Sequence, residues 1–434
     1  MEQSYLRGLS FILLFVFIYG KAHIVNAFEP EDILAPSIGP VLILPKATLS
    51  TSYEDNVFLS GNNIKNVDDV VTTFSPGVGL QYGQNLLDNN YIGIDYSPSF
   101  LWYADNNELN TDNHSLSFGI NYQKEGKFTF SGTDKIDLNN TLLRGRERAL
   151  FSNLEDGSEG SKGLLIERFS TIDRYRFEYT ISPKTSVYIS TSADVVDYEE
   201  SAHYYYKTVF GDLIPYSLFD VSNWNNTIGF GWQGLSKVKF YGSFFYGITS
   251  VETNLSSMGL RPDSDISGGH ISANAEFSER LTGSLQLGYQ TRDFDLLDNG
   301  IGGNTHSLPI IQTELQYQYT EKGAVSFAYT RGGNVSVESP NNALTSDFIS
   351  LFVEQQLGTT GKFSVKFDSK YQIDSYETSN ALEYKYFRLG VGLTYRFNQW
   401  MRSNLSYNTE IFDSNKGNID YNLNRVMLGL SVGY

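Results

Sequence analysis

The sequence contains no cysteine among its 434 residues. This absence excludes a disulfide framework and a lipoprotein anchor, because both need a thiol. Basic residues are also scarce: 32 lysines and arginines stand against 49 aspartates and glutamates, and the formal net charge is −17. Nucleic acid selects basic surfaces, so we expect no nucleic-acid partner. We expect most of the acidic residues to be solvated charges of surface loops.

Long hydrophobic runs are missing after the first residues of the chain. Leu9–Tyr19 is apolar but shorter than the roughly 18 residues that a transmembrane helix needs. Arg7 precedes this run, and Val25-Asn26-Ala27 follows it with the small residues of a cleavage site. This pattern predicts a secretory signal peptide over residues 1–27, with a membrane anchor as the alternative. Elsewhere only the strands of a closed barrel could cross a lipid bilayer.

What the chain does have is a repeated alternation with a period of two residues. Side chains alternate between the two faces of a strand, so each such segment has one apolar face and one polar or small face. In one segment Leu389, Val391, Leu393, Tyr395 and Phe397 alternate with Arg388, Gly390, Gly392, Thr394 and Arg396. Closed into a sheet with the apolar face outward, this pattern predicts a transmembrane antiparallel up-and-down β-barrel. Aromatic residues near strand ends suit its interfacial girdles, among them Trp102, Tyr103, Trp232, Phe397 and Trp400.

Short polar connections alternate with longer loops rich in Asn, Asp, Gly and Ser, which is typical of bacterial barrels with short periplasmic turns and long extracellular loops. About sixteen strands fall between Asp69 and Glu410, with one before (about Ala47–Phe58) and one after (about Leu423–Tyr434), so the pattern predicts about eighteen strands. Sixteen in all is the alternative, because the first strand and Tyr205–Trp224 are ambiguous. Residues 28–45 are expected to form a short periplasmic or lumenal segment, and residues 46–434 the barrel.

The segment Leu44–Tyr122 resembles a bacterial family of outer-membrane β-barrel porins that is often associated with exopolysaccharide biosynthesis loci. The features that carry the resemblance are Tyr53-Glu54-Asp55-Asn56-Val57-Phe58, Val70–Phe74, Ser75-Pro76-Gly77, a strand ending in Tyr103, and Asp112-Asn113-His114. The resemblance implies an outer-membrane location and a role in polysaccharide secretion, and it supplies no catalytic residue. Pro76 lacks a backbone donor, so we expect a local break or bulge in its strand.

The polar face of the strands is the strongest candidate for a functional surface. Charged rings in a water-filled barrel set its selectivity for ions and solutes. The candidates for such a pore lining are Arg174, Arg176, Glu178, Lys239, Glu276, Glu314, Lys366, Asp368, Lys370, Arg388, Arg396 and Glu410. The alternative for each of them is a charge that only hydrates and cross-links the wall.

The loop Asn139–Phe169 is unusually long, and its charges are divided along its length. Long loops are often functional, and this one could fold into the barrel and oppose basic and acidic edges across a constriction. The constriction-loop candidates are Arg144, Arg146, Arg148, Glu155, Asp156 and Glu159.

We predict no catalytic, cofactor-binding or metal-binding residue. The histidines lack the spacing of a metal motif, and no GxSxG sequence is present. His114, His203 and His306 are expected in loops as solvated side chains. Asp105, Glu108, Asp112 and Asn113 carry the oxygen ligands that calcium prefers, but they lack EF-hand spacing, so a plain loop is the preferred interpretation.

The sequence therefore predicts a bacterial outer-membrane channel for a hydrophilic solute, with exopolysaccharide secretion as its more specific form. An enzyme barrel, a structural or adhesive barrel with a closed lumen, and a soluble β-sandwich are the alternatives. Expected partners are outer-membrane lipid, the barrel-assembly machinery, and polysaccharide and export components. The sequence gives no signal for the oligomeric state.

Overall fold

The structure is a computed structural model that describes residues 36–57, 59, 66–83, 90–124, 126–142, 165–198, 203–207, 213–217, 220–252, 263–295, 303–335, 343–376, 383–415 and 420–433. Its strands are long, with the alternating pattern of the sequence running through each of them. They are β2 (Val41–Glu54), β3 (Asp69–Tyr82), β4 (Tyr91–Tyr103), β5 (Thr111–Lys124), β6 (Phe128–Leu142), β7 (Leu165–Ser182), β8 (Thr185–Tyr198), β11 (Asp220–Leu235), β12 (Val238–Glu252), β13 (Ser264–Ser278), β14 (Leu281–Phe294), β15 (Thr305–Thr320), β16 (Gly323–Val335), β17 (Ala343–Leu357), β18 (Phe363–Tyr376), β19 (Glu383–Arg396), β20 (Met401–Ser414) and β21 (Tyr421–Gly433).

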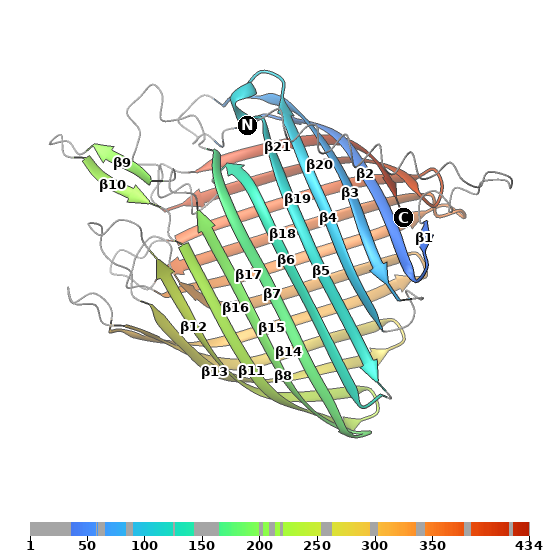
Figure 1. Cartoon of the computed structure of the whole chain (residues 1–434), viewed down its shortest axis with the longest axis vertical. Helices are drawn as coiled ribbons and strands as arrows, with labels where there is room; N and C mark the ends of the chain where they lie inside the picture. The colour runs from blue at the N-terminus through green and yellow to red at the C-terminus, as the bar shows by residue number, and fades with distance from the viewer. Residues whose placement is uncertain are drawn as a thin grey trace.

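These strands form one closed barrel, as Figure 1 shows. Each pairs antiparallel with its neighbour along the chain, and β21 pairs with β2 to complete the circle. Without the two-residue β1 (Ser37–Ile38), the 19-stranded sheet holds eighteen strands. The predicted antiparallel β-barrel of about eighteen strands is confirmed. The ambiguous region after β8 contains a separate hairpin of β9 (His203–Lys207) and β10 (Leu213–Ser217), and β11 then returns to the barrel.

Apolar side chains cover the outside of this barrel. The exposed fractions of Ile228, Phe244 and Leu428 are 61%, 75% and 61%. The strand register places Ile228 and Phe244 opposite each other on β11 and β12, so the apolar face is continuous from strand to strand. In a lipid bilayer this surface has the environment it needs, and the apolar residues do not pack into a dry centre.

The first strand begins earlier than predicted. β2 starts at Val41, inside the segment expected to precede the barrel, and β1 folds back on it through the pairs Ser37↔Leu42 and Ile38↔Val41. Pro76 does not cause a bulge, because the register is the same on both sides of it: Phe74 pairs with Phe100, and Val78 with Tyr96.

That register places Pro76 opposite Pro98. Neither proline has an N–H to donate, so the expected local break occurs between β3 and β4 without a shift in register.

Three expectations about loops were wrong. His114, His203 and His306 lie in strands β5, β9 and β15. The strands reach further into the long connections than their composition suggested, because Asn, Asp and His next to the loops still continue the pairing. Tyr103 does not belong to an outward girdle: it is buried on the inner face of β4, whereas Trp102 is exposed on the outer face.

Two small apolar clusters lie inside the barrel at the end with the long loops. One consists of Leu59, Leu344, Tyr376, Tyr384, Phe412, Tyr421 and Leu423, and the other of Val57, Val71, Tyr103 and Leu109. Val57 and Leu59 come from the connection between β2 and β3. This connection therefore turns inward and packs on strands at both sides of the seam between β2 and β21.

Candidate functional site

The inner wall of the barrel is the candidate site. The strand register places all twelve predicted pore-lining residues on the face opposite to the exposed apolar one. They come from seven strands: Arg174, Arg176 and Glu178 from β7, Lys239 from β12, Glu276 from β13, Glu314 from β15, Lys366, Asp368 and Lys370 from β18, Arg388 and Arg396 from β19, and Glu410 from β20. A role in a solute pathway stays a prediction for each of them.

Glu178 is the centre of the most connected group on this wall. Its carboxylate lies 2.8 Å from Arg176 Nη2 and 3.0 Å from Lys239 Nζ. The guanidinium of Arg176 also stacks on the Tyr188 ring at 3.7 Å from its centroid. Lys239 reaches Glu178 from β12, past the inner face of β11, which carries a glycine at position 231. The group ties β7, β8 and β12 together while keeping its charges at the lumen surface.

Other candidates form pairs between neighbouring strands. Arg174 Nη2 lies 2.7 Å from a carboxylate oxygen of Asp194, and Lys366 Nζ lies 3.6 Å from Glu354. Arg388 and Asp368 are at 3.9 Å. Such exposed pairs contribute little to stability, so these residues cross-link the wall without closing it.

Four candidates have no such partner. Within the described part of the chain, Glu276, Glu314, Lys370 and Arg396 form no ion pair at 4.0 Å or less. Glu276 and Glu314 border one pocket at the short-turn end of the barrel, and Arg396 borders another. The two unpaired glutamates and Arg396 thus border different pockets at this end.

The seam between the first and last barrel strands has its own polar contacts. Arg425 Nε lies 2.8 Å from Glu54 Oε1, and the two residues are directly opposite in the ladder. The next residue, Asp55, accepts hydrogen bonds from the backbone and side-chain amides of Asn424, both at 2.7 Å. Asn56 donates to the carbonyl of Asn422 at 2.9 Å. These contacts hold the start of the inward connection against β21.

Val57 and Leu59 of the connection between β2 and β3 pack inside the barrel at the long-loop end. Leu59, whose exposed fraction is 1%, adopts a positive φ of 53° and packs on an aromatic row. In that row Tyr384 stacks on Phe412 at 5.5 Å, and Phe412 on Tyr421 at 5.4 Å, between ring centroids. The predicted first strand extends to about Phe58, whereas β2 ends at Glu54. The apolar Val57 and Leu59 within a polar connection are the signal that could have indicated burial.

Asp69 fixes the neighbouring connection between β4 and β5. Its buried carboxylate accepts hydrogen bonds from the backbone amides of Val70, Ala104, Asp105 and Asn106, at 2.6 to 3.1 Å. The side-chain amide of Asn106 donates to it as well, at 2.8 Å. One carboxylate thus accepts the hydrogen bonds of successive backbone amides in the turn after β4.

The predicted constriction loop cannot be placed in the same way. Arg144, Arg146, Arg148, Glu155, Asp156 and Glu159 lie outside the described residues. The strands at its two ends, β6 and β7, continue to Leu142 and from Leu165, so part of the predicted loop is paired sheet.

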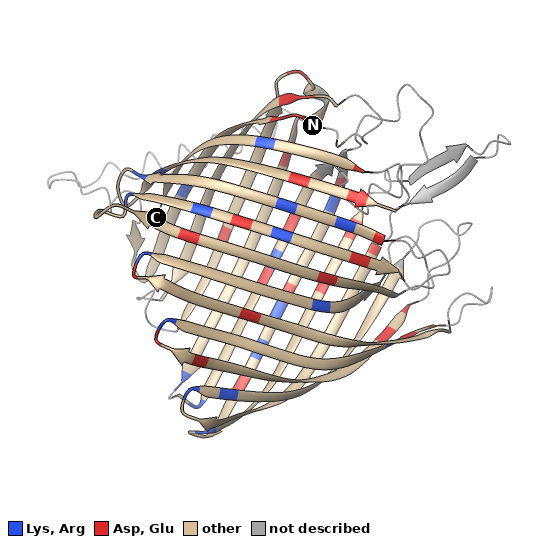
Figure 2. Ribbon diagram, turned by 180° about the vertical axis from the view of Figure 1, so that it is seen from behind, with Lys and Arg blue, Asp and Glu red and all other residues tan. Residues whose placement is uncertain are grey.

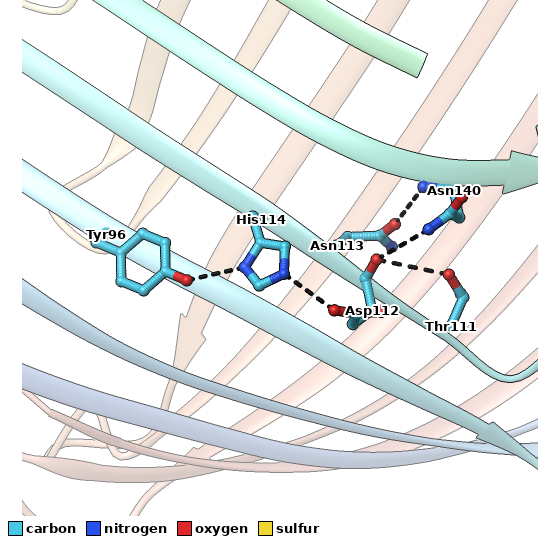
Figure 3. Close-up of polar contacts among 6 residues, drawn as sticks. All are labelled: Tyr96, Thr111, Asp112, Asn113, His114 and Asn140. Carbon is cyan, nitrogen blue, oxygen red and sulfur yellow. Dashed lines mark hydrogen bonds and ion pairs between the residues drawn. The ribbon is translucent and has the colours of Figure 1, made fainter. Parts of the chain in front are cut away.

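A polar cluster on the outer face joins β4 and β5, as Figure 3 shows. Tyr96 Oη lies 2.8 Å from His114 Nδ1, and His114 Nε2 lies 3.0 Å from Asp112 Oδ2. A neutral imidazole satisfies both contacts, with Nδ1 accepting from the tyrosine and Nε2 donating to the carboxylate. Asn113 points the other way and accepts from the backbone amide of Asn140 on β6, at 2.8 Å.

This cluster argues against the calcium hypothesis. Asp112 and Asn113 are successive residues of one strand, so their side chains leave from opposite faces. In the described residues no group of three or more His, Asp or Glu side chains could hold a metal ion. Ser243 Oγ lies 2.7 Å from His270 Nε2 on the inner wall, but Ser243 is buried, so the pair is not presented to a substrate. No helix among the described residues is long and apolar enough to span a membrane.

An apolar outer face, a charged inner wall and closure by eighteen strands together define a porin-like β-barrel of the outer membrane. The expected resemblance to a family of β-barrel porins is confirmed: the family model described as "Putative beta-barrel porin 2" matches residues 222–434, just under half of the chain. This match lies in the C-terminal part, whereas the sequence features that suggested the family lie in the N-terminal part. A search of curated proteins gave no match.

Solved structures of other outer-membrane barrels share the general chain path. OpdK of Pseudomonas aeruginosa is 12% identical, with 90% of this chain and 99% of that chain covered and a TM-score of 0.44. OccAB4 of Acinetobacter baumannii is 12% identical, with 90% and 98% covered and a TM-score of 0.42. The siderophore receptor PirA of Acinetobacter baumannii is 7% identical, with 90% and 80% covered and a TM-score of 0.45. The strand count and topology rest on this chain's own pairing.

Proposed function

We propose that the protein is a passive channel through which a hydrophilic solute crosses the outer membrane. The observation that carries the proposal is the closure of eighteen strands around a wall of charged and hydroxyl side chains. Side chains can fill a barrel of about eight strands, whereas sixteen to eighteen strands leave an aqueous channel. Val57 and Leu59, from the connection between β2 and β3, pack inside the barrel at the long-loop end.

The proposal is tested by electrical recording. The mature chain is folded in detergent, checked for the heat-modifiable gel mobility of a barrel, and added to a planar bilayer. We expect stepwise ohmic conductance, with the same protein after heat denaturation as the control. Folded protein that inserts without conducting would contradict the proposal and favour a structural barrel with a closed lumen.

Export of an exopolysaccharide is the more specific form of this function. Its support is the resemblance of the N-terminal segment to porins of exopolysaccharide loci, and it brings polysaccharide and export components as partners. Deletion of the gene should reduce secreted polysaccharide, and complementation should restore it. Unchanged secretion in the deletion strain would contradict this role and leave the general channel function intact.

Cellular processing is part of the same proposal. A signal peptide over residues 1–27 would direct the chain out of the cytoplasm, and the barrel-assembly machinery would insert it. Mass spectrometry of the protein from outer membranes should show an N-terminus at residue 28. No catalytic role is proposed, and absence of hydrolytic turnover with lipid or ester substrates is the expected result.

A further inference from the structure

Basic residues gather in the short turns of the barrel. Figure 2 shows Lys and Arg in these turns at the end where the C-terminus lies, and Asp and Glu toward the opposite end. Most of the turns carry a basic residue, for example Lys184, Lys237 and Arg280, and in two of them a glutamate, Glu279 or Glu321, precedes it. In bacterial barrels the short turns face the periplasm. The periplasmic rim is therefore the basic one, and a negatively charged solute meets an attractive opening from that side.

In one sector of this rim, three basic residues lie close together at the ends of neighbouring strands. Arg396 is the last residue of β19, Arg402 is the second residue of β20, and Lys362 immediately precedes β18. Arg396 and Arg402 are directly opposite each other in the ladder between their strands. Like charges in this position repel. An anion between or beside the two guanidinium groups would relieve this repulsion.

The residues that the structure describes do not supply that anion. Among the described residues, neither arginine nor Lys362 has a carboxylate within 4.0 Å, whereas Arg174 and Arg388 of the same wall both do. All three side chains are exposed. Their charges remain available to a solute.

The three residues border one pocket of about 570 Å³ at the mouth of the barrel. Lys46 also lines it, with its ammonium 2.8 Å from Asp95, so that cation is already partly compensated. Asn398 and Gln399 add amide groups to the lining, and Trp400 adds an aromatic ring. Charge, amide hydrogen bonds and a flat apolar surface are combined in a space large enough for a sugar-sized group.

We infer that this pocket, formed by Lys362, Arg396, Arg402 and Trp400, binds an oxyanion of the transported solute, a carboxylate or a phosphate, as it enters from the periplasm. This inference rests on the proposed channel function and names the chemical class of the solute. Guanidinium groups bind both oxyanions through paired N–H donors. A bound anion also removes the repulsion between Arg396 and Arg402, so binding and local order of the mouth are coupled.

The test compares Arg396→Gln/Arg402→Gln with the control Lys184→Gln/Arg280→Gln, which removes two exposed charges from other short turns at the same end. Both variants are first checked for heat-modifiable mobility. Tri-galacturonate, inorganic phosphate and neutral maltotriose are added to each chamber of a zwitterionic bilayer in turn. Binding of the same probes to the detergent-folded proteins is measured by calorimetry.

We expect tri-galacturonate or phosphate to block the current from one chamber only, and maltotriose to have no effect. Loss of two charge-assisted contacts should raise the dissociation constant by about tenfold or more in the Arg396→Gln/Arg402→Gln variant. The control variant should bind like the wild type. Equal dissociation constants in wild type and the Arg396→Gln/Arg402→Gln variant would overturn the inference. Competition by added phosphatidylglycerol would assign the pocket to lipid headgroups and also overturn it.

Failure of the site and failure of the channel give different results. Conductance without any anion block overturns the site and leaves the channel function. Calorimetric binding that depends on the two arginines, in a protein that does not conduct, supports the site and contradicts the channel.

Discussion

The Glu54–Arg425 pair at the barrel seam permits a quantitative prediction. Glu54 Oε1 and Arg425 Nε are 2.8 Å apart, and their side chains are only 10% and 26% exposed. Glu54 attracts this arginine both through its charge and through a hydrogen bond. Glu410 also acts electrostatically on this arginine. One cation therefore compensates two buried carboxylates.

Replacing Arg425 with glutamine leaves both carboxylates without that cation. Breaking a buried pair in this way costs about 3–5 kcal/mol, since the remaining charge stays desolvated. The same substitution at Arg174 is the matched control: its pair with Asp194 is 2.7 Å long on the same inner wall, but the side chains are 46% and 36% exposed. An exposed pair is worth about 0–1 kcal/mol. We expect the two variants to differ by about 3 kcal/mol.

The assay is denaturant unfolding of the protein in lipid vesicles, followed by tryptophan fluorescence and by gel mobility. Arg425→Gln should lower the midpoint clearly, and Arg174→Gln should shift it little. Adding Glu54→Gln to Arg425→Gln should recover part of the loss, because it removes one of the uncompensated charges. Equal midpoints for Arg425→Gln and Arg174→Gln would refute the argument that burial makes the seam pair important.

Three further substitutions have expected outcomes. Asp69→Asn changes a carboxylate whose two oxygens accept hydrogen bonds from the backbone amides of residues 104–106. It should lower the free energy of unfolding by about 1–3 kcal/mol in the same assay. No loss would show that water replaces the carboxylate. Phe412→Ala removes the middle ring of the aromatic row and should cost about 3–5 kcal/mol, unless the row collapses to fill the space. Glu178→Gln frees the two cations that it contacts and should shift the reversal potential in a salt gradient toward anions; an unchanged potential would remove this group from the ion path.

Much of the fold could be predicted because the residues of each strand alternate between the apolar outer face and the polar inner face of the barrel. The alternation in residues 388–397 gives the inward and outward sides directly, and loop lengths give the number of strands. Partners on the inner wall are less predictable. Alternation places Glu178 and Lys239 on the same face, but their contact depends on the register of the strands between them and on Gly231, whose missing side chain leaves space.

The path of the connection between β2 and β3 is a second feature that the sequence does not predict. Asp55 and Asn56 are common turn residues, but both fall inside the predicted strand of about Ala47–Phe58. Their direction is set by Asn422 and Asn424, whose positions depend on the closure of the whole barrel. The free arginines at the mouth are a similar case: Arg396 was a candidate from its strand position, whereas Arg402 becomes relevant only through its place in the ladder.

Closure of the barrel also has a consequence for biogenesis. β2 obtains its second neighbour only from β21, and the contact between Thr48 and Ser431 spans 383 positions. Until that strand arrives, a nascent chain offers two open edges with unsatisfied backbone groups, a state prone to aggregation. Nearly the complete polypeptide must therefore be present before the barrel can close.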